Sequence, residues 1–294
     1  MNSLRPQLVA SGFKYPVSPR WWDDSLYFTD AYGKKVYQMA VDGSDVVEVA
    51  DLDGMPSGLG ELPDGAKLVG EQMTRMLWRL TDTGVDPKPF ADLSDYSENW
   101  TRDMITAADG ITYTTCFGHG ISRGEPPAQG VVVMTTADGA SRVAADRIMM
   151  PNGIALADDG RTLLIAETAG ERITAFDRRG DGTLSNRRVW ASIPGGAPGG
   201  ICLDAEVGLW LGSVYTGEFM RVLEGGEVTH RIPSPGRWAI AALVGGKGQS
   251  QLFLFSTDTD FERIKIGDMR GRIDVVDLRG FGLVAPEMSE IQPR

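Results

Sequence analysis

The sequence contains few of the residues that usually carry covalent or metal chemistry. Its 294 residues include two cysteines and two histidines. The separation of Cys116 and Cys202 fits neither a zinc cluster nor a disulfide framework, so we expect two reduced thiols. Cys202 stands in the apolar run GICLD and is expected to be buried, because a free cysteine behaves as a small hydrophobic residue.

Long apolar runs and an excess of basic residues are missing as well. The N-terminal stretch MNSLRPQLVASGFKYP has no apolar core of signal-peptide length, and no other stretch approaches the roughly 18 apolar residues of a membrane span. Forty acidic residues against 29 basic ones give a net charge of −11, which repels nucleic-acid phosphates and anionic lipids. We therefore predict a cytoplasmic protein whose partner is a small-molecule substrate, with no nucleic acid and no membrane as partner. The oligomeric state stays open.

Tight turns and apolar residues are abundant. The chain contains 37 glycines and 16 prolines, and 42% of its residues are hydrophobic, which indicates a buried core interrupted by many turns. All-β folds of this length often form one unit, so residues 1–294 are predicted to be a single domain. No phosphate-binding loop, dinucleotide fingerprint, serine elbow or HExxH motif is present in the sequence.

One unit recurs along the chain: a short apolar strand, a turn of the Asp-Gly type, an alternating strand, a polar loop and a further strand. Its clearest copy is PNGIALADDGRTLLIAETAGERITAFDRRGDG at 151–182. Six copies align, at intervals of 40, 45, 50, 47 and 40 residues, on Val17, Ser57, Arg102, Asn152, Gly199 and Ala239. Such repeats predict an all-β, six-bladed β-propeller. A β-sandwich does not need six equivalent strand sets, and a solenoid needs a tighter, more uniform period.

Several of these segments resemble the gluconolactonase/regucalcin (senescence marker protein) family of six-bladed propellers. The resemblance is carried by PNGIALADDGRTLLIAET, ERITAFD, DGTLSNRRVWA and GICLDAEVGLW, and it is strongest over 146–227. It implies a divalent metal, typically calcium or zinc, bound in the central channel by a Glu, two Asn and an Asp. It also implies hydrolysis of sugar lactones or related esters, in which the metal polarises the carbonyl and a nearby Asp handles water.

Three of the four family ligands are replaced in this chain. The Glu position is Val17 of PVSPRW, the first Asn position is Arg102 of TRDM, and the Asp position is Gly199 of PGGI, while the second Asn is kept as Asn152. A lone amide oxygen cannot hold Ca²⁺, which takes six to eight oxygen ligands, and a guanidinium repels a dication. We predict that no cofactor binds. The alternative is a calcium or zinc site with recruited ligands, Asp103 beside Asn152.

Three residues are predicted to be catalytic: Arg102, Asp103 and His119. A planar cation in the metal position can bind a carboxylate through two hydrogen bonds or stabilise an oxyanion. Asp103 is either a general base or simply the partner of Arg102. His119 lies in the loop FGHGISRGEPPAQG at 117–130, which we expect to cover one mouth of the channel, and its usual pKa suits proton transfer.

A second set of residues is predicted to bind substrate, with packing inside the blades as the alternative. Aromatic residues at matching repeat positions would wall an apolar pocket that still offers hydroxyl donors. Glu71 and Glu167 share another repeat position and could point into the channel, and Cys116 matches them in the third repeat. Besides these two glutamates, the predicted substrate-binding residues are Asn152, Tyr32, Tyr215, Trp100 and Trp238.

Three classes of function stay open. The first is a metal-free enzyme that uses Arg102 on a small lactone, carbonyl or carboxylate-bearing substrate, by hydrolysis or by proton transfer such as elimination, isomerisation or cyclisation. The second is a metal-dependent lactonase with rearranged ligands, including Glu71 and Glu167. The third is a propeller that binds a ligand without catalysis, since function resides in the site and this site differs from the family pattern.

Overall fold

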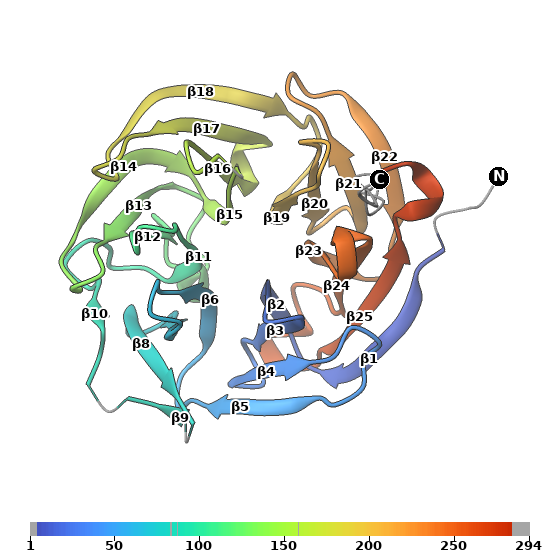
Figure 1. Cartoon of the computed structure of the whole chain (residues 1–294), viewed down its shortest axis with the longest axis horizontal. Coiled ribbons are helices and arrows are strands. Elements are labelled where there is room, and N and C mark those ends of the chain that lie inside the picture. The colour runs from blue at the N-terminus through green and yellow to red at the C-terminus, as the bar shows by residue number, and fades with distance from the viewer. Residues whose placement is uncertain (1–4, 83, 87, 158, 284–294) are drawn as a thin grey trace, which may run out of the picture.

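Short β-strands make up nearly all of the regular structure. The computed structural model describes residues 5–82, 84–86, 88–157 and 159–283, and its sheets stand around a central axis as the blades of a propeller (Figure 1). No helix in this part of the chain is long and apolar enough to cross a membrane. The helical segments are short 3₁₀ turns: η1 (Ile121–Arg123), η2 (Thr168–Gly170), η3 (Lys247–Gln249), η4 (Ile264–Ile266) and η5 (Arg279–Phe281).

Four sheets each arise from one continuous stretch of chain, and consecutive strands pair in antiparallel fashion, except that β10 pairs with β8 and not with β9. The first contains β2 (Pro16–Trp22), β3 (Ser25–Asp30), β4 (Lys35–Met39) and β5 (Val47–Asp51). The second contains β6 (Pro56–Glu61), β7 (Lys67–Glu71), β8 (Met76–Thr81), β9 (Gly84–Val85) and β10 (Ala91–Asp92). The third contains β11 (Thr101–Thr106), β12 (Thr112–Cys116), β13 (Gln129–Thr135) and β14 (Ser141–Met149), and the fourth β15 (Pro151–Leu156), β16 (Thr162–Glu167), β17 (Arg172–Arg178) and β18 (Leu184–Ser192).

The remaining strands form one eight-stranded sheet, in the order β1-β25-β24-β23-β19-β20-β21-β22. Its strands are β1 (Gln7–Phe13), β19 (Pro198–Leu203), β20 (Leu209–Ser213), β21 (Glu218–Val222), β22 (Val228–Pro233), β23 (Trp238–Gly245), β24 (Gln251–Asp258) and β25 (Arg270–Asp277). Its two four-stranded halves join where β19 and β23 run parallel at Gly200 and Ala241. A Cβ at Gly200 would lie 2.4 Å from the Cβ of Ala241, so glycine permits this close approach.

The two ends of the described chain meet in the same sheet. Strand β1 pairs with β25 in antiparallel register from Gln7 opposite Val275 to Phe13 opposite Gly271. Figure 1 shows the blue N-terminal strand beside the red C-terminal strand at the outer edge. The pairing closes the circle of sheets with main-chain hydrogen bonds, so the two ends stabilise each other.

The burial pattern follows the position of a strand between axis and surface. Strand β16 (TLLIAE) is buried along almost its whole length, because neighbouring sheets cover both of its faces. Strand β18, at the outer edge of the same sheet, carries a run of exposed polar residues. The Asp-Gly turns also behave as the sequence indicates: Asp159 Oδ1 accepts a hydrogen bond from the Arg161 N–H at 2.8 Å, and Gly160 adopts a φ of +66°.

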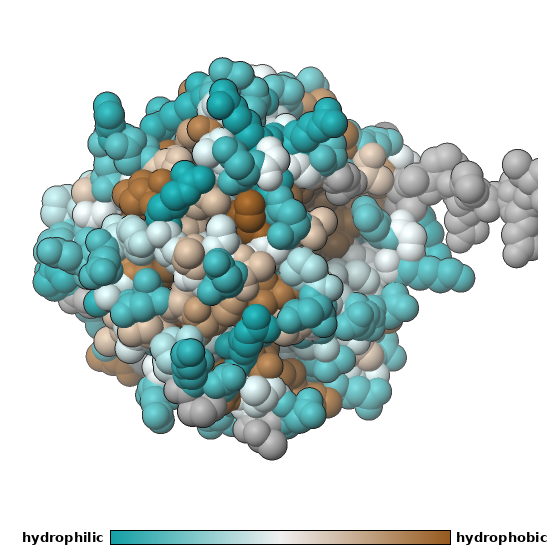
Figure 2. All heavy atoms as spheres, turned by 60° about the vertical axis from the view of Figure 1, so that its left-hand side comes forward, coloured by the Kyte–Doolittle hydropathy of each residue, from teal (hydrophilic) through white to brown (hydrophobic). Residues whose placement is uncertain are grey.

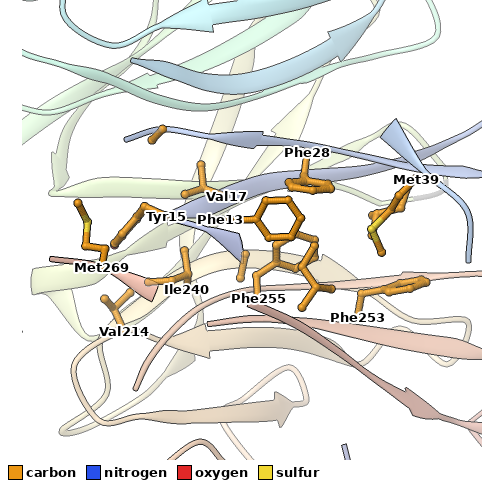
Figure 3. Close-up of a cluster of buried hydrophobic side chains, with 14 residues drawn as sticks. Phe13, Tyr15, Val17, Phe28, Met39, Val214, Ile240, Phe253, Phe255 and Met269 are labelled. Atoms are coloured by element: carbon orange, nitrogen blue, oxygen red, sulfur yellow. The ribbon is translucent and has the colours of Figure 1, made fainter. Parts of the chain in front are cut away.

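The hydrophobic core lies between neighbouring sheets. Figure 3 shows the cluster between the first and the last sheet, where the rings of Phe13 and Phe28 meet edge to face at 4.9 Å and Phe255 lies 5.7 Å from Phe28. Tyr15 and Val17 extend this cluster toward the axis. The packing that stabilises the fold therefore also supports the floor of the central site. The face of the molecule drawn in Figure 2 is largely hydrophilic, in keeping with a solvated outer surface.

Candidate active site

The six aligned repeat positions occupy equivalent places in the structure. Each is the second residue of a strand next to the axis, namely β2, β6, β11, β15, β19 or β23. These strands contact one another in succession, and β23 contacts β2, so they form a closed ring (Figure 1). Each of these strands pairs with the next strand of its own sheet, and in every case the register of this pairing shifts close to the aligned position. The shift begins either at the aligned residue or at the residue just before it. Such bulges redirect side chains, and here they turn Arg102 and Asn152 toward the axis.

Two neighbouring spaces that share lining residues lie on the axis. The larger is a cavity of about 510 Å³, and the smaller is a chamber of about 20 Å³. Tyr15, Arg102, Asn152 and Val214 border both spaces, so these residues separate the cavity from the chamber. The cavity is of a size that holds a small organic molecule.

The walls of the cavity are mainly aromatic, and its charged residues are cationic. None of the described residues in its lining is an aspartate or a glutamate. The aromatic lining residues are Tyr15, Tyr32, Trp100, Phe117, Tyr215, Trp238 and Phe261, and the other polar ones are Gln72, Arg102, Asn152 and Lys265. The structure thus brings Tyr32, Tyr215, Trp100 and Trp238 together around Arg102 and Asn152, as the repeat positions indicated.

Arg102 is a cation without an acidic partner among the described residues. Its Nη1 donates a hydrogen bond of 2.7 Å to Gln72 Oε1, and its guanidinium lies over the ring of Phe117, 5.1 Å from the centroid. Its Nε is shielded from water and has no hydrogen-bond partner in the described chain. The guanidinium borders the cavity, so its N–H groups that reach the cavity are left for an acceptor on a ligand.

Asp103 is paired with Arg20 and not with Arg102. Its carboxylate accepts a hydrogen bond of 2.7 Å from Arg20 Nη2 and one of 3.0 Å from the Met104 N–H. Arg20 also donates to the carbonyl oxygens of Pro19 and Leu59. Both side chains of the pair are largely buried, and Asp103 borders the small chamber. The structure thus pairs Asp103 with Arg20, which leaves the charge of Arg102 uncompensated.

Asn152 is oriented by a chain of hydrogen bonds. Its Nδ2 donates to Thr168 Oγ1 at 3.1 Å, and Thr168 Oγ1 donates to the Pro198 carbonyl at 2.7 Å. Thr115 Oγ1 donates to the main-chain carbonyl of Asn152 at 2.7 Å. The side-chain oxygen of Asn152 has no partner among the described residues, so it is available as an acceptor at the boundary between cavity and chamber.

Three tyrosines near Arg102 are held in the protonated form. Burial raises the pKa of Tyr15, Tyr32 and Tyr215, and the positive charge of Arg102 offsets only part of this effect. The rings of Tyr15 and Tyr32 lie 5.7 Å apart. At neutral pH these phenols are hydrogen-bond donors or acids, because a raised pKa disfavours the phenolate.

His119 lies behind the wall of the cavity. It is 3% exposed, it stacks on Phe117 with ring centroids 5.1 Å apart, and its Nδ1 accepts a hydrogen bond of 3.5 Å from the Ala128 N–H. Burial lowers the pKa of His119. The loop at 117–130 does border the cavity, but through Phe117, Ile121 and Gly124. Where we predicted a catalytic histidine, the structure has an imidazole that supports Phe117.

Glu71 and Glu167 hold main-chain connections and do not line the cavity. Glu71 is 3% exposed and accepts hydrogen bonds from the N–H groups of Met55 and Thr74 at 2.7 and 2.6 Å. Glu167 is fully buried and accepts hydrogen bonds from the Met149 N–H at 2.7 Å and Arg172 Nη2 at 2.8 Å. The shared repeat position is thus one where an acceptor fixes the connection that leads into the first strand of its own sheet. We predicted that the carboxylates of Glu71 and Glu167 could point into the channel, but in the structure they accept hydrogen bonds from main-chain N–H groups.

The two cysteines are free and buried. Burial raises the pKa of both Cys116 and Cys202 to about 12, so both stay as thiols at neutral pH. Cys116 is also not part of the cavity lining. The structure therefore gives Cys116 none of the features of a nucleophile.

The residues on the axis do not fit the metal that the family pattern implies. The chamber and the cavity offer the amide oxygen of Asn152 and the carboxylate of Asp103, which is already paired with Arg20. Arg102 lies between them with its positive charge. No group of three or more His, Cys, Asp or Glu suited to a metal ion occurs among the described residues. Calcium needs six to eight oxygen ligands with several carboxylates, and zinc needs three or four strong donors.

Several residues of the site were not predicted from the sequence, among them Tyr15, Gln72, Phe117 and Phe261. Gln72 directly follows Glu71, and Tyr15 lies two residues before Val17, so both stand close to positions that the repeat pattern did indicate. Phe261 lies in the long connection between β24 and β25, which corresponds to the loop between β12 and β13 in the third sheet. It packs against Trp238 and Tyr215, with ring centroids 5.1 Å away in each case.

The chain belongs to the family described as SMP-30/Gluconolactonase/LRE-like region, whose model matches residues 15–258. It is similar to regucalcin from Gallus gallus, at 21% identity over 290 residues that cover 90% of each chain. A solved gluconolactonase from Xanthomonas campestris has 25% identity and a TM-score of 0.70, and the match covers 91% of this chain and 88% of that one. A solved luciferin-regenerating enzyme has a TM-score of 0.79 at 16% identity, covering 93% and 96%, which shows the shared fold.

Proposed function

We propose that this protein is a metal-independent, lactonase-like enzyme in which Arg102 occupies the place of the family's metal ion. The single observation that carries the proposal is the uncompensated guanidinium at an aligned axial position, at the boundary of a cavity of about 510 Å³ whose described lining residues include no carboxylate. We also infer a six-bladed scaffold, with the eight-stranded sheet counted as two blades, because its halves meet in one parallel residue pair. The similarity to a gluconolactonase supports the reaction class.

Arg102 would act as the electrophile of the site. Addition of water to a lactone carbonyl places negative charge on the carbonyl oxygen, and a fixed cation stabilises this oxyanion without reorganisation. The protonated phenols of Tyr15, Tyr32 and Tyr215 surround Arg102 and can donate further hydrogen bonds. When the ring C–O bond breaks, the same phenols can supply a proton to the leaving oxygen.

Asp103 is the proton acceptor in this proposal. The chamber that it borders has about 20 Å³, enough for about one water molecule, which needs roughly 10–15 Å³ measured in this way. A water there can donate to Asp103 and to the free oxygen of Asn152 while it faces the cavity. Its addition to the carbonyl carbon transfers one proton toward Asp103 and yields a hydroxy acid.

The second function in keeping with this site is proton transfer on a carbonyl compound: elimination, isomerisation or cyclisation. It is supported by the protonated phenols beside a guanidinium, an arrangement that stabilises an enolate as well as a tetrahedral oxyanion. The two functions differ in their use of water. Incorporation of ¹⁸O from labelled water into the product separates them, because only hydrolysis adds an oxygen atom.

The proposal is tested by turnover on a panel of lactones and esters with wild-type protein, Arg102→Met and Arg102→Lys. Loss of one oxyanion donor lowers kcat by about 100-fold to 1,000-fold, and Arg102→Met should lose at least this much. Arg102→Lys keeps the charge but lacks the planar guanidinium, so its kcat should lie between that of wild type and that of Arg102→Met. Arg147→Met, at a side chain that is 76% exposed, is the matched control. Equal kcat in Arg102→Met and wild type would refute the proposal, and binding without turnover would indicate a non-catalytic propeller.

A further inference from the structure

We infer that the ligand of this site is an aromatic compound that carries one carboxylate and no other charge. The carboxylate is either present in the substrate or formed in the reaction. The inference rests on the proposed function in that it concerns the same cavity. It goes further in naming the substrate class, and it separates this protein from enzymes whose substrates are polyhydroxylated sugar acids.

The carboxylate is assigned by the hydrogen-bond pattern of Arg102. Gln72 occupies Nη1, at 2.7 Å, and Phe117 covers one face of the guanidinium. The guanidinium borders the cavity, and Nε, which is shielded from water, has no partner among the described residues. A carboxylate is the acceptor that a guanidinium binds most strongly, and it also supplies the missing negative charge.

A single anionic group is assigned by the absence of a second free cation among the described residues of the lining. The other cationic residue of the lining is Lys265, in the exposed turn η4. Its Nζ already donates a hydrogen bond of 2.7 Å to Glu262. A dicarboxylate would therefore bring its second charge into an aromatic pocket without a counter-ion, which is costly.

The aromatic body is assigned by the walls. Tyr215, Trp238 and Phe261 pack against one another, with ring centroids 5.1–5.3 Å apart. Tyr215 and Phe261 are nevertheless 42% and 58% exposed, so apolar ring surface is left for a ligand to cover. Aromatic pairs are favourable in stacked and edge-to-face arrangements, and this wall offers both faces and edges.

A sugar acid fits the cavity poorly because each of its hydroxyl groups needs an acceptor for its proton. The lining contains no carboxylate among its described residues, and Gln72 Oε1 already accepts from Arg102. The free side-chain acceptors in the described lining are the oxygen of Asn152 and the phenol oxygens of the tyrosines. These are fewer than the hydroxyl groups of a sugar acid, and hydroxyl groups without an acceptor would lose their hydrogen bonds to water without replacement.

Gln72 is a positioning residue for this ligand. It is fully buried, and its Nε2 donates to the Pro56 carbonyl at 3.4 Å, so its oxygen is directed at Arg102. Gln72→Glu keeps the shape and the acceptor, loses the Nε2 donor to the Pro56 carbonyl, and pairs the charge of Arg102 with a carboxylate. A merely structural disturbance would weaken the binding of acid and amide alike, whereas loss of the positioned free cation removes the preference for the acid.

The experiment is equilibrium binding by calorimetry and by quenching of the fluorescence of Trp100 and Trp238. The probes are phenylacetate, its uncharged analogue phenylacetamide, and gluconate. Wild-type protein should bind phenylacetate at least about tenfold more tightly than the other two probes, as expected for a charge-assisted hydrogen-bonded pair. Both Arg102→Met and Gln72→Glu should abolish the preference for acid over amide, and Arg147→Met should keep it.

The inference is overturned if gluconate binds as tightly as phenylacetate, if acid and amide bind equally, or if Arg102→Met keeps the preference. The comparison of probes on wild-type protein needs no variant, so it remains decisive even where a variant does not fold. Failure of the proposed function is a separate result: phenylacetate binds through Arg102, but no lactone or ester is turned over. Conversely, turnover that depends on Arg102 with no preference for the aryl acid refutes the substrate class alone.

Discussion

The buried ion pair between Arg20 and Asp103 allows a stability prediction that is independent of the substrate. Its atoms lie 2.7 Å apart, and the two side chains are 11% and 7% exposed. Asp103→Asn keeps the size of the side chain but leaves Arg20 buried without a counter-charge. Breaking a buried pair in this way costs about 3–5 kcal/mol. We expect the lower end, about 3 kcal/mol, because Arg20 keeps its hydrogen bonds to the carbonyls of Pro19 and Leu59.

The assay is urea denaturation followed by tryptophan fluorescence, analysed at constant m-value. In a thermal scan, a loss of about 3 kcal/mol in the free energy of unfolding would appear as a fall in Tm of roughly 6–12 °C for a domain approaching this size. The double variant Arg20→Met with Asp103→Asn should recover most of the loss, since neither charge then remains buried. Additive effects of the two substitutions, or a loss below about 1 kcal/mol for Asp103→Asn, would refute the reasoning.

Two further predictions concern residues outside the cavity. Burial alone would raise the pKa of Glu167, but hydrogen bonds from Arg172, Thr174 and the Met149 N–H outweigh it and lower this pKa. Its contribution to stability is therefore present above the pKa of Glu167 in the unfolded chain and is lost as the pH falls through the pKa in the folded protein. Glu167→Gln should flatten the pH dependence of the free energy of unfolding below pH 5, measured by urea titration. An unchanged slope would count against this assignment. His119→Gln should keep kcat within about threefold of wild type, because an acid or base usually contributes 100-fold or more; a larger loss with an unchanged Tm would assign His119 a catalytic role.

The repeat pattern was sufficient to predict the fold class and the positions on the axis. Alternating apolar strands and Asp-Gly turns recur at nearly regular intervals, and the aligned residues Arg102 and Asn152 both border the central cavity. The alignment succeeds because every strand next to the axis starts in the same way and is interrupted by a bulge at nearly the same point. The number of separate sheets could not be predicted from the sequence. The parallel pairing at Gly200 joins two of them, and it depends on how closely two strands approach, which the spacing of the repeats does not indicate.

Side-chain direction was the part that the sequence could not supply. Glu71 and Glu167 were correctly matched to one repeat position, but their carboxylates point to main-chain N–H groups of the preceding connection. His119 stacks behind Phe117 because loop glycines permit several directions, and packing selects one of them. Phe261 was missed because it lies in the connection between β24 and β25, outside the strands whose periodicity the alignment used.

The central claim is that a side-chain cation has replaced the metal, and metal content measured together with activity tests it most directly. The purified protein would be analysed by inductively coupled plasma mass spectrometry and assayed on its best lactone or ester before and after exhaustive chelation. The account predicts substoichiometric calcium and zinc, unchanged kcat after chelation, and loss of activity in Arg102→Met. A stoichiometric divalent metal whose removal abolishes turnover, and whose return restores it, would contradict the account.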